Sequence, residues 1–442
     1  MAVGRMAEPL VLRTAAWYGD RELTLRWPAH WHVAVHRPVR ATPLGDDDVA
    51  ARLRAPLGQP PLAELARGRK RPLVIVDDLN RPTPAWRVLP AILAQLADAG
   101  IPAERVRIVM GPGTHGAPAA DAFEKKIGRE AAHVCQLLVH DCRGPVVSAG
   151  RTSAGTPILV NPHVVDSDLV IGVGGVYPNQ TAGFGGGAKL ALGVLGFRSI
   201  ASLHHRHASF GWGGVDGKSG FRRDLEEIAE RIGLETTVGL LLDGERAIVD
   251  LCCGETREAH AALVARRERF RAPRPAADTH VVIANAYPND LSLTFVRMKG
   301  LVPLAHAPAG ASRVAVASCP EGLGFHGLFP FLNAPRHHRE RMLLLRLPML
   351  AHRPGELVAK VLRRVARELR TRVGGRRPAP ARPVWVYRPS LDRPMGALPA
   401  DIPGMRVRGG WDDVVRSVDA EQGHRAALQA EVYACTPLQW IG

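Results

Sequence analysis

Residues 77–82 (DDLNRP) place two carboxylates and a guanidinium in a single turn that follows an apolar run. Arg81 could hold a carboxylate or a phosphate through its bidentate fork, with Asp78 beside it. The structural alternative is an aspartate that caps a helix start next to a surface arginine. The turn is therefore a candidate anion site.

A second motif, residues 111–116 (GPGTHG), also follows an apolar run. Its glycines let the backbone approach a ligand closely and leave Thr114 and His115 exposed in a cleft. Imidazole is the side chain best suited to take a proton near neutral pH, although a lone loop histidine can also be incidental. His115 is thus a candidate general base.

The densest motif is the glycine-rich stretch of residues 172–189, in which Gly185, Gly186 and Gly187 precede Lys189. Successive backbone N–H groups of this kind cradle anions, and the lysine adds a cation. The stretch does not have the residues of a Walker A loop around its lysine, and it contains no dinucleotide-binding G-x-G-x-x-G fingerprint. We expect it to bind a cofactor of another type.

Three histidines lie within residues 203–207 (LHHRH), as a metal ligand or as a solvated basic face. Lys189 and His205 are 16 residues apart, a span of roughly 24 Å if the chain between them were one helix. Gly193 and Gly196 weaken such a helix. A bend there would bring the lysine and the histidine to one ligand.

Two further motifs, residues 286–290 (AYPND) and 320–324 (PEGLG), follow apolar runs in the second half of the chain, with Lys299 between them. Both could face a cleft between domains, where small-molecule sites tend to form, and both could be ordinary turns.

The elements that position these motifs follow an α/β rhythm. Strands are expected at residues 73–77, 106–110, 137–140, 158–160 and 169–173, and again at 280–284, 313–318 and 384–387. Helices are expected at 84–99 and 119–128, and a proline-rich linker at 269–277. We therefore predict two Rossmann-like α/β domains, residues 1–272 and 273–442, with the active-site cleft between them.

The bulk properties exclude several classes of protein. The formal charge is +16, much of it in arginines of basic helices expected at 341–347 and 357–369, but the low aromatic content disfavours nucleic-acid binding. No apolar run is long enough to span a membrane, and no secretory signal is evident. The six cysteines contain no Cys-x-x-Cys pair, so we expect a cytoplasmic protein with reduced thiols.

Taken in order, the motifs resemble the nickel-dependent lactate racemase family from about residue 77 to 324. The resemblance rests on D-x-N-R-P, G-T-H, G-F-x-G-G-x-K, a histidine 16 residues beyond that lysine, Y-P-x-D and E-G-L-G. It implies a pyridinium mononucleotide with two sulfur-bearing arms, the nickel-pincer nucleotide, in which two sulfurs, a ring carbon and a protein histidine hold nickel. Cofactor-synthesis proteins are then implied partners.

The resemblance also implies roles for individual residues. The cofactor would be linked covalently to Lys189 and lined by Thr114 and the three glycines, and nickel would be bound by His205. The catalytic set would be His115 as base, Asp78 and Arg81 in the first loop, and Lys299 on the substrate carboxylate. The glutamine expected three residues before Lys299 is Val296 here.

The implied reaction removes the hydroxyl proton of a 2-hydroxy acid and transfers hydride reversibly from its α-carbon, with a histidine on each side. The second histidine belongs at position 179, which is Asn179 here, and asparagine does not take a proton near neutral pH. His163 aligns elsewhere, while His204 or His207 could serve if turned inward. The expected function is a 2-hydroxyacid racemase or epimerase. The alternatives are a weakly active member that carries the cofactor, and a one-base epimerase or redox relative acting on another hydroxy acid.

Overall fold

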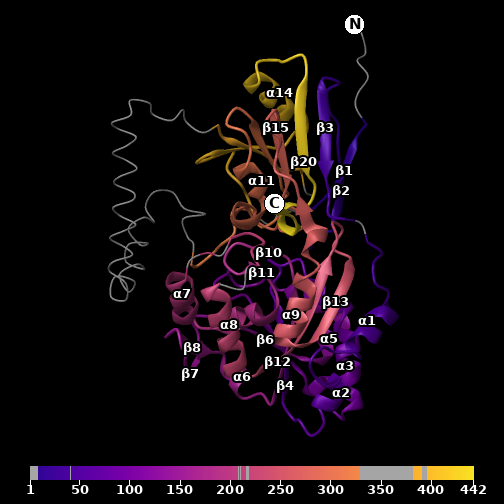
Figure 1. The fold of residues 1–442 in the computed structure, drawn as a ribbon, viewed down its shortest axis with the longest axis vertical. Coiled ribbons are helices and arrows are strands. Elements are labelled where there is room, and N and C mark those ends of the chain that lie inside the picture. Colours follow the sequence, from indigo (N-terminus) through magenta and orange to yellow (C-terminus); the bar gives the residue numbers. More distant parts are fainter. Residues whose placement is uncertain are drawn as a thin grey trace.

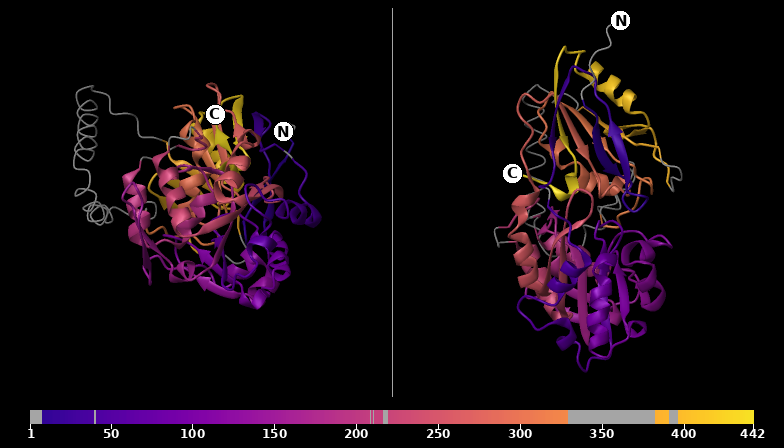
Figure 2. Two further views of the ribbon diagram at one scale, coloured as in Figure 1. Left: turned by 60° about the horizontal axis from the view of Figure 1, so that its bottom comes forward. Right: turned by 90° about the vertical axis from the view of Figure 1, so that its right-hand side faces the viewer.

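The computed structural model describes residues 8–39, 41–207, 209, 211–215, 219–328, 382–390 and 396–442. It has the mixed α/β fold that the sequence predicts, built on two large sheets that lie one above the other along the longest axis (Figures 1 and 2). The first sheet occupies the lower part of Figure 1 and the second sheet the upper part. No helix among the described residues is both long and apolar enough to cross a bilayer.

The first sheet has six strands in the order β13-β12-β9-β4-β5-β6, and all neighbours are parallel except β12 and β13. Its strands are β4 (Pro72–Asp77), β5 (Arg107–Gly111), β6 (Gln136–Val139), β9 (Leu169–Gly175), β12 (Leu234–Leu242) and β13 (Ile248–Glu255). The strands predicted at 73–77, 106–110, 137–140 and 169–173 are thereby confirmed. Because parallel strands end at one edge, their following loops gather there.

Helices cover both faces of this sheet, which explains its continuous apolar strands. Val74 and Val76 of β4 pack with one group of helices, whereas Leu73 and Ile75 point to the other face. The first group comprises α1 (Asp46–Leu53), α2 (Leu62–Leu65), η1 (Ala85–Arg87), α3 (Leu89–Asp98), α4 (Ala122–Ile127), α5 (Arg129–Val134) and α9 (Thr256–Val264). The second group comprises α6 (Pro162–Val165), η3 (Gly187–Val194), α7 (Phe197–Arg206) and α8 (Gly220–Arg231).

The second sheet has seven strands in the order β18-β19-β17-β16-β15-β20-β3, parallel except for the pair β18 and β19. They are β3 (Trp31–His36), β15 (Val281–Asn285), β16 (Ser312–Val316), β17 (Val384–Tyr387), β18 (Asp401–Ile402), β19 (Met405–Arg408) and β20 (Leu428–Tyr433). β15, β16 and β17 confirm the strands predicted there. Helix α14 (Trp411–Glu421) packs on one face, and α10 (Leu293–Phe295) and α11 (Val302–Ala305) lie near the other.

β3 is a departure from the sequence-based division at residue 272. The sequence assigns this segment to the N-terminal domain, but β3 pairs with β20 at the edge of the second sheet. Its burial pattern explains the miss, since only Trp31 of the six residues is buried. An edge strand of this kind carries little hydrophobic signal.

The remaining elements are short. The predicted strand at 158–160 is β8 (Pro157–Val160), which pairs with β7 (Val147–Arg151) outside the large sheets. The predicted linker is partly ordered, because η4 (Arg267–Phe270) leads into β14 (Arg271–Ala272), which pairs with β21 (Trp440–Ile441). The other short elements are β1 (Leu10–Thr14), β2 (Arg21–Leu25), η2 (Ala103–Arg105), β10 (Pro178–Asn179), β11 (Gly183–Phe184), η5 (Val296–Gly300) and η7 (Thr436–Leu438). The basic helices predicted at 341–347 and 357–369 lie outside the described residues.

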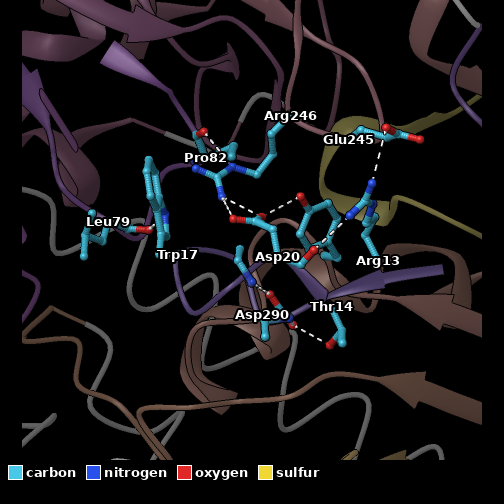
Figure 3. A network of polar contacts seen from close by, with 12 residues as sticks. Arg13, Thr14, Trp17, Asp20, Leu79, Pro82, Glu245, Arg246 and Asp290 are labelled. Atoms are coloured by element: carbon cyan, nitrogen blue, oxygen red, sulfur yellow. Dashed lines mark hydrogen bonds and ion pairs between the residues drawn. The ribbon is translucent and has the colours of Figure 1, made fainter. Parts of the chain in front are cut away.

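Residues 14–20 bind elements of both sheets (Figure 3). The carboxylate of Asp20 accepts a hydrogen bond from Arg246, in the β12–β13 turn, at 2.6 Å and from the Tyr287 hydroxyl, after β15, at 2.7 Å. The Trp17 indole N–H donates to the carbonyl of Leu79 at 2.8 Å. This segment therefore connects the loop after β4 with the loop after β15.

Candidate functional site

A cavity lies where β4, β5 and β9 end, and residues that follow β15 and β16 complete its wall. Most of the residues singled out from the sequence line it, namely Asp78, Arg81, Thr114, His115, Asn179, Gly185, Gly186, Lys189 and Lys299. Gly187 and His205 are not among the lining residues. Loops far apart in the chain thus converge as their positions after parallel strands predict.

His115 and Asp78 form a hydrogen-bonded pair in this cavity. His115 Nδ1 lies 2.8 Å from Asp78 Oδ2, and both side chains are almost fully buried. Burial alone would raise the pKa of Asp78, but the facing imidazole and the Arg81 guanidinium outweigh it and lower that pKa. Burial lowers the pKa of His115, against the opposing effect of the carboxylate. The pair is therefore an ionised Asp78 that orients a neutral imidazole, whose Nε2 can accept a proton.

The loop that carries Asp78 and Arg81 is held by a lysine that the sequence did not single out. Lys126, fully buried in α4, donates to Asp77 Oδ1 at 2.7 Å and to the carbonyls of Arg81 and Thr83 at 3.0 and 3.1 Å. Asp77 also accepts from the Thr83 hydroxyl at 2.7 Å. Lys126 is thus a structural cation behind the site, and in the sequence it resembles its half-buried neighbour Lys125.

The glycine-rich loop turns sharply before Lys189. Gly186 has φ +73°, a conformation that favours glycine, and a Cβ there would meet Val176 at 2.7 Å. Gly187 has φ +56° and packs against His260, so its role is to shape the turn. Burial, with the nearby charges of Arg81 and Arg222, lowers the pKa of Lys189 well below its usual value. A lysine of this kind has the neutral amine that nucleophilic chemistry requires.

Lys299 enters the cavity from the second half of the chain. It lies in the π-helical turn η5, is 3% exposed, and packs its ammonium 4.8 Å from the Tyr177 ring centroid. No described residue offers a hydrogen-bond partner to its Nζ. Burial and the charges of Arg81 and Lys189 lower its pKa well below the usual value. A buried amine of this kind is suited to an anionic ligand.

Asn179 lines the cavity, but its side-chain oxygen serves its own loop. Oδ1 accepts from the Thr181 hydroxyl at 2.8 Å and from the backbone N–H groups of Thr181 and Ala182, each at 3.1 Å. Asparagine commonly stabilises turns in this way. This residue therefore shapes the turn that leads into the glycine-rich loop.

The chain between Lys189 and the histidine cluster bends as expected. The 3₁₀ helix η3 ends at Val194, and α7 starts at Phe197 after Gly196. Of the clustered histidines, His204 lines the cavity, and its Nδ1 lies 2.8 Å from the Ile200 carbonyl oxygen. Burial, with Lys189 nearby, lowers the pKa of His204 to about 3. His205 follows on α7 outside the lining set, and His207 pairs with Asp224 at 2.7 Å.

His326 is a cavity residue that the sequence did not identify. It is 4% exposed and follows the E-G-L-G motif by two residues. Its ring centroid lies 5.1 Å from that of His115 at an interplanar angle of 63°. Burial, together with His115 and Arg81, lowers the pKa of His326 to about 2. It is therefore a neutral imidazole beside the candidate base.

The arrangement can bind an anion and move a proton. Arg81, Lys189 and Lys299 are the cations, and His115 is the proton acceptor. In the part of the chain that the structure describes, no three His, Cys, Asp or Glu side chains gather as a metal site. A metal here would need ligands that the protein alone does not supply.

Comparisons with known proteins agree with this site. Residues 18–212 match the family model described as the lactate racemase N-terminal domain. A lactate racemase of Thermoanaerobacterium thermosaccharolyticum is 25% identical over 312 residues, covering 68% of this chain and 72% of that protein. One of Lactiplantibacillus plantarum is 23% identical over 330 residues, covering 72% and 77%.

Two solved structures share the fold. The lactate racemase apoprotein of T. thermosaccharolyticum superposes with a TM-score of 0.68 at 18% identity, covering 98% of this chain and all of that one. A Thermotoga maritima protein superposes with a TM-score of 0.57 at 14% identity, covering 90% and 99%.

Proposed function

Since the chain belongs to the lactate racemase family, we propose that it is a 2-hydroxyacid racemase or epimerase that uses the nickel-pincer nucleotide. The observation that carries the proposal is the convergence of three groups in one cavity. These are a lysine with a depressed pKa, a buried lysine whose amine has no described partner, and a histidine backed by a carboxylate.

The chemistry of the cavity residues fits the cofactor. The neutral amine of Lys189 suits a covalent link to an acyl-type arm, and the backbone of Gly185 and Gly186 with Thr114 suits a phosphate-bearing group. Because fewer than three protein ligands gather among the described residues, nickel would be held by the cofactor's own sulfur and carbon atoms and one histidine. The resemblance favours His205 as that histidine, and the cavity lining favours His204.

When bound, the cofactor would supply a reversible hydride acceptor for the α-carbon of the substrate. The chain's own residues would do the rest. Lys299 and Arg81 would bind the substrate carboxylate, and burial would strengthen that attraction. His115 Nε2 would take the hydroxyl proton while Asp78 stabilises the imidazolium that forms.

A second candidate is a member that carries the cofactor or works with a base on one side only. It is supported by Asn179, which stands at the position of the second histidine and whose Oδ1 is occupied by its own turn. The substrate and the racemase activity are therefore less firmly supported than the cofactor.

Intact-mass measurement after co-expression with the cofactor-synthesis proteins tests the proposal. We expect a covalent adduct that is lost in Lys189→Ala and kept in Lys125→Ala, which changes a lysine outside the cavity. A panel of chiral 2-hydroxy acids then separates racemase from carrier. An unmodified protein without nickel would overturn both candidates, and an adduct without turnover of any acid would favour the carrier.

A further inference from the structure

We propose that His326 is a second catalytic imidazole, which donates a hydrogen bond from Nε2 to the substrate oxygen that His115 deprotonates. The inference rests on the proposed function, since it assigns a residue of the same cavity. It also locates the second imidazole on the His115 wall, away from position 179.

The backbone fixes His326 against the loop of His115. The Gly327 N–H donates to the carbonyl of Thr114 at 2.6 Å, and His115 and His326 pair as an isolated antiparallel bridge. Phe295 packs against both rings, with centroid distances of 4.8 and 6.1 Å. The two imidazoles, which come from different halves of the chain, are thus held as a unit on one wall.

The hydrogen bonds of the two rings assign them opposite roles. The Leu328 N–H donates to His326 Nδ1 at 3.3 Å, so the proton of the neutral ring is on Nε2. His115 has the reverse tautomer, because its Nδ1–H donates to Asp78. The wall therefore combines a proton acceptor, His115 Nε2, with a hydrogen-bond donor, His326 Nε2–H.

This combination matches the demands of one substrate oxygen. When the hydroxyl O–H bond breaks, the proton forms an N–H bond on His115 Nε2 and the electron pair stays on oxygen. A donor directed at that oxygen stabilises the developing negative charge. A neutral imidazole suits this role, since its low pKa keeps it in the form with one N–H and one acceptor.

Position 179 is unsuited to the same role. The Oδ1 of Asn179 already accepts three hydrogen bonds within residues 179–182. Replacing the second base with a donor next to the first base gives the site one chemically active wall.

The test compares His326→Gln with His326→Asn in cofactor-loaded protein. The glutamine amide nitrogen reaches the place of Nε2, whereas that of asparagine reaches only the place of Nδ1. We expect kcat on the best 2-hydroxy acid to stay within tenfold in His326→Gln and to fall by about 10²-fold or more in His326→Asn. His306→Asn, at an exposed histidine, is the matched control.

A binding measurement separates this inference from the proposed function. Oxamate, an isostere of a 2-oxo acid, should bind His326→Asn at least tenfold more weakly than wild type or His326→Gln in calorimetry. Equal affinity and equal kcat in all three folded proteins would overturn the role of His326. If the loaded wild type turns over no 2-hydroxy acid, the proposed function fails, and the oxamate affinities alone decide whether His326 contacts the ligand.

Discussion

The side-chain oxygen of Asn179 lies 2.8 Å from the Thr181 hydroxyl and also accepts two backbone N–H groups of the same turn. A histidine at 179 would accept at most one of these bonds. We therefore expect Asn179→His to lower the free energy of unfolding by about 1–3 kcal/mol without increasing kcat. Urea unfolding and initial rates measure both effects. Asn179→Asp, which keeps the acceptor, should retain wild-type stability, and a faster Asn179→His enzyme would show that the position accepts a base.

The Asp78–His115 pair predicts a large loss of rate on removal of the carboxylate. A neutral amide in place of the carboxylate would no longer stabilise the imidazolium, so kcat of Asp78→Asn should fall on the order of 10²–10⁴-fold. Substrate affinity should change less, because the carboxylate-binding cations remain. Asp98→Asn, at an exposed carboxylate on α3, controls for the loss of charge. A drop of less than threefold would argue against His115 as the base.

The pH dependence of kcat/KM should be bell-shaped. His115 must be neutral to accept a proton, and its pKa is lowered, so the acid limb should fall below pH 6.5. Lys299 must be charged to bind a carboxylate, and its pKa is also lowered, so the activity should be lost on the alkaline side before pH 10.5. In Lys299→Arg the guanidinium stays charged, and the alkaline limb should move to higher pH. An unmoved alkaline limb would exclude Lys299 as its source.

Nickel content distinguishes the two candidate ligands on α7. His204 lines the cavity and His205 does not, so His204→Ala should lower the nickel bound per loaded protein more than His205→Ala. Elemental analysis of protein whose adduct is verified by mass measures this difference. His133→Ala, at an exposed histidine, should bind nickel as wild type does. Loss confined to His205→Ala would instead support the family spacing and imply a turn of α7.

Lys126 provides a stability prediction. Its removal leaves the Asp77 carboxylate without its buried cation, so Lys126→Met should lower the free energy of unfolding by about 3–5 kcal/mol. Lys125→Met, which breaks a half-exposed ion pair with Asp121, should lose at most about 1 kcal/mol. Chemical denaturation compares the two variants. Equal losses would contradict the structural role of Lys126.

The sequence predicted the strands of the first sheet and most of the cavity because both depend on local signals. Apolar runs mark the buried strands, and loops after parallel strands meet at one edge. It did not predict which partner each loop residue meets. Asp78 and His115, for example, are joined only by the pairing of β4 with β5.

Three other features lay beyond sequence patterns for physical reasons. His326 follows its motif without any periodic signal, and its role depends on the bridge to His115. The choice between His204 and His205 depends on helical phase, since neighbours on a helix point about 100° apart. Lys126 looks like a surface lysine until α4 packs against the loop of Asp77.

The pairing of β3 with β20 imposes an order on the birth of the molecule. Residue 31 meets residue 428 in this ladder, so on a ribosome the early strand must wait until nearly all of the chain has been made. The first sheet, whose strands lie between residues 72 and 255, can assemble during that interval. Closing so distant a contact is slow, and an unpaired strand edge is prone to aggregation meanwhile. Expression at lower temperature and with chaperones should therefore raise the yield of native protein.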